Sequence, residues 1–312
     1  MNLLQNWFKK IVSGGRSKKD EYQGFNEDDI RLFDALEKRG ESRVKDFLIK
    51  SFKKMPVSSE DENYAFNYFI TNSVITAVTA TSKASSVLTE FLYDRLSAHS
   101  LIDKHLLQCK SELAVKSRLI TIEEELIKII EKFTQKKENI LIGNFGSGPG
   151  RDVIDVISSH FNKGNVRAIN IDKDIEALRR GEKMAKNKGI SHLVEFVGKS
   201  LMRYETDKKF DIILLIGVLC PLDMETCVAI LSMMKKFLKK DGLLIASNAT
   251  KKMEKEDPLT CHIMEWAANW KLIFKDEAEL KQIFEKAGYH WEGQFIEPNG
   301  FHMMGMGTPN SI

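Results

Sequence analysis

Two kinds of hydrophobic patterning divide the chain near residue 136. From Asn26 to Lys136, apolar residues recur at helical spacing, and few glycines or prolines interrupt them. After the polar stretch 135–138, short aliphatic runs alternate with helical segments, as in a parallel sheet that is covered on both faces. The pattern predicts an all-helical domain over residues 1–136 and an α/β domain over residues 137–312.

Three polar positions in the first half predict the starts of helices. Asn26 and Ser59 each precede a run of acidic residues, which favour the positive end of the helix dipole. Thr121 and Glu124 have the spacing of a capping box. We therefore expect helices to begin at these three places.

The second half predicts a sheet of seven strands. The five strands expected first cover residues 139–142, 166–171, 193–197, 210–215 and 242–247. The helices between and after them cover residues 152–160, 174–187, 225–238 and 276–286. Two last extended runs, 289–296 and 302–307, flank Pro298-Asn299-Gly300 and predict a hairpin, which makes the end of the sheet antiparallel. The expected fold is a doubly wound, mostly parallel α/β sheet.

The N-terminal residues carry a single apolar helical stripe. Leu4, Trp7, Phe8 and Ile11 share one face, and basic residues follow within residues 1–19. This stretch is either a weak membrane-surface or partner-binding helix, or a helix that packs on its own domain. It lacks the cleavage site of a secretory signal, and no apolar run reaches the ~18–20 residues of a membrane span.

Composition narrows the class of protein. Hydrophobic residues make up 43% of the 312 residues and charged residues 29%, which is typical of a soluble globular protein. A net charge of +3 provides no strong field for nucleic acid, so no nucleic-acid partner is expected. The four cysteines form no C-x-x-C pair, so we expect reduced thiols, no metal and a cytoplasmic location.

A glycine-rich loop follows the first expected strand. Gly146, Gly148 and Gly150 form a G-x-G-x-G pattern, which lets the main chain turn tightly and approach a ligand. A dinucleotide fingerprint would need glycine where Arg151 stands, and no Gly-Lys-Ser/Thr of a phosphate-binding P-loop follows. The alternative is a tight turn without a ligand.

This loop resembles motif I of the class I S-adenosylmethionine-dependent methyltransferases, and the resemblance extends over residues 138 to about 308. The later elements follow in the family's order: Asp172 ends the second strand, residues 196–200 form the adenine loop, and Gly217 follows the fourth strand. The resemblance implies S-adenosylmethionine as cofactor. The positions that it implies for cofactor binding are Asn144, Gly146, Ser147, Gly148, Gly150, Asp172, Lys173, Ser200, Leu201 and Gly217.

Several of these positions have another reading. Asp172 would accept from the ribose hydroxyls in the family, but it could instead cap the following helix, a role for which Asp174 competes. The family usually has an acid where this chain has Asn144, and often an acid near Ser200. Losing those charges weakens attraction to a cationic ligand, which leaves open a methyltransferase fold that binds without turnover.

Methyl transfer from a sulfonium depends on alignment more than on acid or base catalysis, so no catalytic triad or metal cluster is required. His262 is a candidate base, although a structural role is the alternative. Met264 and the aromatic residues after it either line an acceptor pocket or belong to the core. Residues 264–280 and 217–222 resemble bacterial methyltransferases that esterify 3-hydroxy fatty acids. That resemblance implies a carboxylate acceptor, which Lys275 or Lys271 would orient.

We therefore expect an enzyme that methylates a small-molecule acceptor, with O-methylation of a fatty-acyl or other carboxylate as the specific form. The alternatives are an inactive binding or regulatory module and a protein or RNA methyltransferase. The small net charge argues against RNA, and residues 248–250 differ from the Asn/Asp-Pro-Pro-Phe/Tyr loop of amino-methylating enzymes. Oligomeric state is left open, a homodimer included.

Overall fold

The computed structural model describes residues 22–82 and 100–310, in two compact units, Met1–Phe69 and Ile70–Ile312. The expected N-terminal stripe within residues 1–19 lies outside the described residues. Within the described ranges, no helix has both the length and the apolar character needed to cross a membrane.

The first unit is built from helices α3 (Glu27–Lys38), α4 (Ser42–Phe52) and most of α5 (Ser59–Asn72). Asn26 caps α3 in a reciprocal capping box with Asp29, which confirms that expected start. The cap of α5 is Ser58 rather than Ser59, because the Ser58 hydroxyl accepts a hydrogen bond from the Asp61 backbone N–H at 3.0 Å. The buried core of this first unit includes the side chains of Phe33, Leu36, Phe47 and Leu48.

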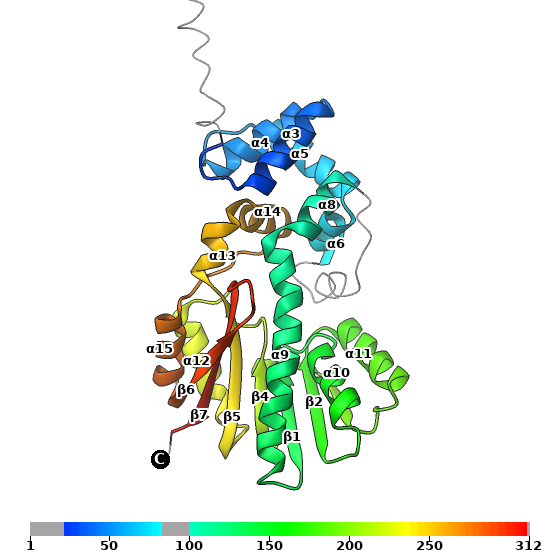
Figure 1. Ribbon diagram of the computed structural model, residues 1–312, viewed down its shortest axis with the longest axis vertical. Helices are drawn as coiled ribbons and strands as arrows, with labels where there is room; N and C mark the ends of the chain where they lie inside the picture. Colours follow the sequence, from blue (N-terminus) through cyan, green and yellow to red (C-terminus); the bar gives the residue numbers. More distant parts are fainter. Residues whose placement is uncertain (1–21, 83–99, 311–312) are drawn as a thin grey trace, which may run out of the picture. The chain divides into compact units, whose positions relative to one another are not determined.

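The second unit contains a seven-stranded sheet in the order β3-β2-β1-β4-β5-β7-β6 (Figure 1). Its strands are β1 (Ile140–Phe145), β2 (Val166–Asp172), β3 (Val194–Gly198), β4 (Phe210–Leu215), β5 (Leu238–Ala249), β6 (Tyr289–Ile296) and β7 (His302–Pro309). β1 to β5 pair in parallel, and β7 pairs antiparallel with both β5 and β6. The mostly parallel sheet with a closing hairpin is confirmed.

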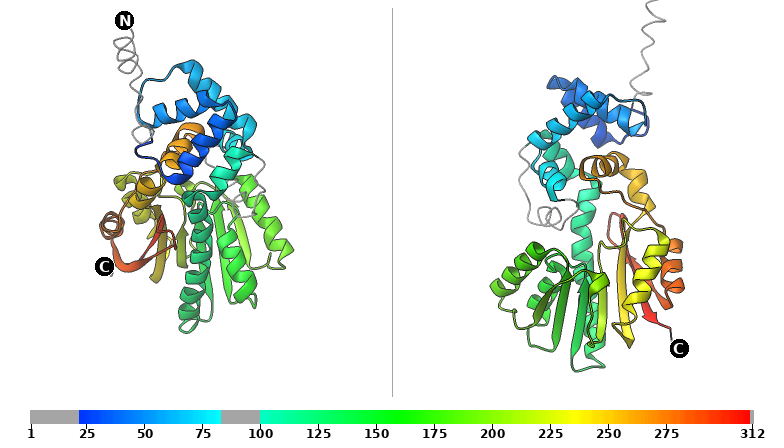
Figure 2. Two further views of the ribbon diagram at one scale, coloured as in Figure 1. Left: turned by 45° about the horizontal axis from the view of Figure 1, so that its top comes forward. Right: turned by 180° about the vertical axis from the view of Figure 1, so that it is seen from behind.

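Helices cover both faces of this sheet. On one face lie α9 (Lys110–Thr134), α10 (Arg151–His160) and α11 (Ile175–Asn187), which bury an aliphatic cluster against the strands. The other face, seen from behind in Figure 2, carries α12 (Met224–Met234) and α15 (Glu277–Lys286) over a second cluster that is rich in aromatic side chains. The result is a three-layer α/β fold.

The domain boundary differs from the expected one at 136/137. Residues 70–136 belong to the same compact unit as the sheet, because α9 buries Ile122, Leu126 and Ile130 in the sheet's own core. The capping box expected at Thr121 is also wrong, since α9 runs through that position without a break.

A helical layer of the second unit consists of α6 (Val74–Ser82), α8 (Leu101–Gln108), α13 (Lys251–Glu256) and α14 (Pro258–Ala268). Figure 1 shows it beyond the carboxyl ends of the parallel strands, and α14 packs against α6. The helices α13 and α14 form an insertion after β5, and this insertion is attached to the start of α9. Asp257 accepts a hydrogen bond from the Ser111 backbone N–H at 2.8 Å, and Lys110 forms an ion pair with Glu256 at 3.1 Å.

Candidate functional site

The glycine loop lies between the end of β1 and the start of α10. Gly146, Gly148 and Gly150 all have positive φ, at 66°, 55° and 73°, a conformation that costs other residues strain. The loop is held against β2, because the backbone N–H groups of Gly146 and Ser147 donate to the Ile171 carbonyl at 2.8 and 3.2 Å. The turn is thus fixed by main-chain contacts.

Side chains would not fit at two of these glycines. A Cβ at Gly146 would lie 2.6 Å from Cγ2 of Val218, in the loop after β4, and one at Gly150 would lie 2.3 Å from the Asn170 side-chain oxygen. The loop therefore packs bare main chain between β2 and β4. This is the point where the strand order reverses, and it is where open α/β sheets bind ligands.

Asp172, at the end of β2, holds this loop in place. Its Oδ2 accepts from the Gly148 backbone N–H at 2.7 Å, and its Oδ1 accepts from the Asp174 N–H at 2.8 Å. The cap of α11 is Asp174, which accepts from Ala177 at 3.0 Å, so Asp172 is not that cap. A carboxylate has about four acceptor positions, so Asp172 keeps capacity for further donors beside the exposed Lys173.

Two more predicted positions lie in loops at the same edge of the sheet. After β3, the half-buried Ser200 accepts from the Met202 N–H at 3.3 Å and caps a short 3₁₀ turn, Leu201–Arg203. After β4, Gly217 has φ +77° and donates its N–H to the Ser247 hydroxyl at 2.8 Å. The structure thus brings the loops after β1, β2, β3 and β4 to one edge.

Asn144 is buried below the glycine loop. Its amide Nδ2 donates to Oδ1 of Asp152 and to Oδ1 of Asn170, each at 3.0 Å. Asp152 lies in the first turn of α10, and burial raises the pKa of its carboxyl to about 6, against the opposing effects of the Val153 N–H, Asn144 and Arg118. Asp152 was not predicted as a site residue, although its place directly after the loop was a usable signal.

A buried cation, also not predicted, reaches the site from α9. The Arg118 side chain is 8% exposed, and its Nη1 lies 3.9 Å from where a Cβ on Gly217 would be. Burial lowers the pKa of the His302 imidazole well below its usual value, and the charge on Arg118 lowers it further. An arginine within an otherwise apolar helical stripe was the signal for this group.

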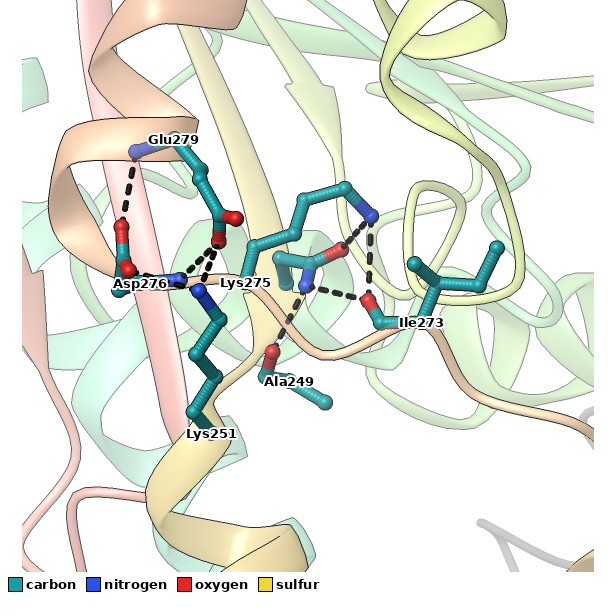
Figure 3. A network of polar contacts seen from close by, with 7 residues as sticks. Ala249, Lys251, Ile273, Lys275, Asp276 and Glu279 are labelled. Carbon is teal, nitrogen blue, oxygen red and sulfur yellow. Dashed lines mark hydrogen bonds and ion pairs between the residues drawn. The ribbon is translucent and has the colours of Figure 1, made fainter.

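Lys275, one of the two catalytic candidates, has a different environment from the one expected. Its buried ammonium donates to the Leu222 carbonyl at 2.8 Å and the Ile273 carbonyl at 3.1 Å. It also donates to Oδ1 of Asn248 at 3.3 Å and to the Leu219 carbonyl at 3.5 Å. Figure 3 shows Lys275 directed at Ile273, while neighbouring Lys251 pairs with Asp276 and Glu279. Lys275 therefore fastens the loop after β4 to β5.

His262, the other candidate, lies on α14, and burial lowers the pKa of its imidazole. Lys271 is exposed and pairs with Glu265 at 3.3 Å. Met264 and Phe274 pack on a buried apolar cluster that includes Met253 and Phe301, as expected of core residues. Among the described residues, no group of three or more His, Cys, Asp or Glu side chains is placed to hold a metal ion.

The family comparison concerns the same part of the chain. Residues 136–288 match a family model described as a methyltransferase domain. No curated protein sequence matches the chain.

Solved structures show the same fold at low sequence identity. A possible exported protein from Bordetella parapertussis is 13% identical, with a TM-score of 0.67, over 86% of this chain and 96% of that one. Magnesium protoporphyrin IX methyltransferase from Synechocystis PCC 6803, with bound S-adenosylhomocysteine, is 13% identical, with a TM-score of 0.54, over 76% and 99%. A putative O-methyltransferase from Nostoc punctiforme PCC 73102 is 16% identical, with a TM-score of 0.51, over 78% and 71%. The family model assigns residues 136–288 to a methyltransferase domain, and the solved structures show that the α/β part of this chain has the fold of the class I S-adenosylmethionine-dependent methyltransferases.

Proposed function

We propose that the chain binds S-adenosylmethionine at the glycine loop and methylates a carboxylate oxygen of a small acceptor with an apolar body. The observation that carries the cofactor part is the loop itself, whose bare main chain is held against a carboxylate at the end of β2. An adenosine ligand with vicinal hydroxyls and a cationic tail fits such an arrangement of backbone and acid.

The residues present fit this cofactor in three respects. The absence of side chains at Gly146 and Gly150 is enforced by the contacts that a Cβ would make. Asp172 retains acceptor positions for the ribose hydroxyls beyond its two backbone hydrogen bonds. Asn170 has a buried amide Nδ2 without a partner among the described residues, so the floor of the loop retains an unused donor.

Two histidines of the C-terminal part, His262 and His302, favour an acceptor that is already ionised. Burial lowers the pKa of both His262 and His302, so each imidazole is neutral near pH 7 and a weak base. A hydroxyl or amine acceptor benefits from a stronger base. A carboxylate is ionised at neutral pH and needs none, so it matches these groups.

The insertion after β5 supports an apolar acceptor body. Met253 and Phe301 form a buried apolar cluster with Ala249, at the end of β5, and residues of α14 pack on it. Arg118 adds a positive charge close to Gly217, where a carboxylate can be held by charge-assisted hydrogen bonds. Ala114 of this cluster lies one helical turn before Arg118 on α9, so apolar side chains and a cation lie together, the combination that a fatty acid or a similar organic acid requires.

In this proposal the chain's residues bind and orient rather than transfer protons. When bound, S-adenosylmethionine supplies a methyl group activated by a sulfonium, and reaction requires the acceptor oxygen in line with it. The glycine loop and Asp172 hold the adenosine end, and Arg118 orients the acceptor carboxylate. Lys275 holds the loop after β4 in position through its hydrogen bond to the Leu222 carbonyl.

The acceptor part is tested with a matched panel of substrates. The chain is incubated with S-adenosylmethionine and with 3-hydroxy and unsubstituted fatty acids, and with the alcohols and amides of the same chain lengths. We expect methyl esters of the acids, identified by mass spectrometry, together with one equivalent of S-adenosylhomocysteine. Methylation of the alcohols or amides in preference to the acids would overturn the carboxylate proposal.

A further inference from the structure

The site departs from its family's usual pattern at the end of β1, where a neutral Asn144 stands in place of an acid. The structure shows what this amide does. It is 1% exposed, and its Nδ2 donates at 3.0 Å both to Asp152 on α10 and to Asn170 on β2. Asn144 therefore links the floor of the glycine loop to a carboxylate eight positions later in the chain.

That carboxylate lies directly after the loop. Asp152 is two residues beyond Gly150, in the first turn of α10, and its Oδ1 accepts from Asn144 and from the Val153 N–H at 2.9 Å. Both hydrogen bonds go to Oδ1, which leaves Oδ2 without a hydrogen bond from the described residues. Asp152 as a residue is half-buried, in the first turn of the helix that follows the loop.

The charged groups around Asp152 determine its ionisation. Arg118 on α9 favours the carboxylate form, whereas Asp155 on α10 opposes it. Glu123 on α9 also lies close to Asp152, and burial and the neighbouring acids raise the Glu123 pKa to about 8, so Glu123 holds its proton at pH 7. Asp152, with a pKa of about 6, is the ionised member of this pair at neutral pH.

We propose that Asp152 supplies the negative charge that binds the ammonium of the cofactor's amino-acid end, and that Asn144 is the positioning residue that holds Asp152 at the loop. The inference rests on the proposed binding of S-adenosylmethionine. The acidic charge that the family usually has at the end of β1 is then supplied in this chain by Asp152, in the first turn of α10. On this basis the substitution at 144 is no sign of an inactive module.

Two ligands separate this role from a structural one. S-adenosylhomocysteine carries the ammonium, whereas 5′-methylthioadenosine has the same adenosine and sulfur but no amino-acid end. Isothermal titration gives the Kd of both for the full chain, for Asp152→Asn and for Asp155→Asn. Asp155 is the matched control, because it lies on the same helix and forms ion pairs with Arg151 and Lys188 at 3.4 and 3.1 Å.

We expect Asp152→Asn to weaken S-adenosylhomocysteine about 10-fold or more, the scale of a charge-assisted hydrogen bond, and to change 5′-methylthioadenosine less than about 2-fold. Asp155→Asn should change neither Kd by more than about 2-fold. The double variant Asn144→Asp/Asp152→Asn returns the acid to the end of β1 and should recover part of the lost affinity.

An equal loss for both ligands, or no loss for S-adenosylhomocysteine, would overturn the role of Asp152. If the unaltered chain binds neither ligand, the proposed function fails as well, and the two failures are thereby distinguished. A measurement on the unaltered chain covers the case in which Asp152→Asn does not fold. Its affinity for S-adenosylhomocysteine should fall as the pH drops from 7.5 to 5, while that for 5′-methylthioadenosine stays constant; parallel pH profiles would contradict the proposal.

Discussion

Glu112 gives the sharpest test of the packing between α9 and the insertion after β5. Its side chain is 5% exposed in the first turn of α9, beside Asp257, Lys116 and Cys109. Glu112 Oε2 and Asp257 Oδ1 are buried without hydrogen-bond partners among the described residues. Burial, with a further contribution from Asp257, raises the pKa of Glu112 from 4.5 to about 8.

Because folding raises the pKa of Glu112, a rise in pH destabilises the folded chain. In the unfolded chain Glu112 ionises near pH 4.5, whereas in the folded chain it keeps its proton until about pH 8. Between those values the folded state binds more protons than the unfolded state, so the free energy of unfolding decreases as the pH rises. Each pKa unit corresponds to about 1.4 kcal/mol, which gives a loss of about 3 kcal/mol between pH 5.5 and pH 8.

The perturbation is Glu112→Gln, which keeps the shape and cannot ionise. We expect its stability relative to the unaltered chain to increase by about 3 kcal/mol between pH 5.5 and pH 8, measured by urea unfolding. The exposed Glu124 of the same helix is the control, and Glu124→Gln should change stability by less than about 0.5 kcal/mol at either pH. If Glu112→Gln and the unaltered chain lose stability equally over this range, the carboxyl is not buried as described.

Three further substitutions test the site. Gly150→Ala should lower both the free energy of unfolding and the affinity for S-adenosylhomocysteine, because it adds a clash with Asn170 to the strain of positive φ. Gly189 is the control, since it has nearly the same φ and no neighbour within 4 Å. Gly189→Ala should cost only about 1–2 kcal/mol of strain and leave the affinity unchanged. Lys275→Met should lower the free energy of unfolding, measured by urea titration, by about 3–5 kcal/mol, because it leaves buried carbonyl oxygens without a donor. The exposed Lys271 is the control, and Lys271→Met should change that free energy by less than about 0.5 kcal/mol. Asp172→Ala should weaken S-adenosylhomocysteine about 10-fold or more by isothermal titration, and unchanged affinity would remove it from the site.

Local patterns in the sequence were sufficient for the sheet. The apolar run of β4 and the two extended runs around Pro298-Asn299-Gly300 matched the observed strands closely, because continuous burial and a turn signal leave few alternatives. The role of α9 was harder to predict. Helical periodicity shows that one face of a helix is buried, but not which element covers it, and α9 proved to cover the sheet.

The parts of the site that depend on local main-chain conformation could be predicted from the sequence. The parts that depend on contacts between distant residues could not. Positive φ at the motif glycines and the acid at the end of β2 follow from neighbouring sequence. The approach of Arg118 to Gly217 brings together residues almost a hundred positions apart, which no local pattern encodes. Lys275 looked like a ligand-binding charge because three of its four oxygen partners, on Leu219, Leu222 and Asn248, lie far away in the sequence.

Titration of the full chain with S-adenosylhomocysteine is the most direct test of the glycine loop as an adenosyl-amino-acid site. We expect saturable binding with one ligand per chain, lost or strongly weakened in Asp172→Ala, and no heat from NAD or ATP under the same conditions. No binding at about 1 mM S-adenosylhomocysteine, or tighter binding of NAD or ATP at this loop, would contradict it.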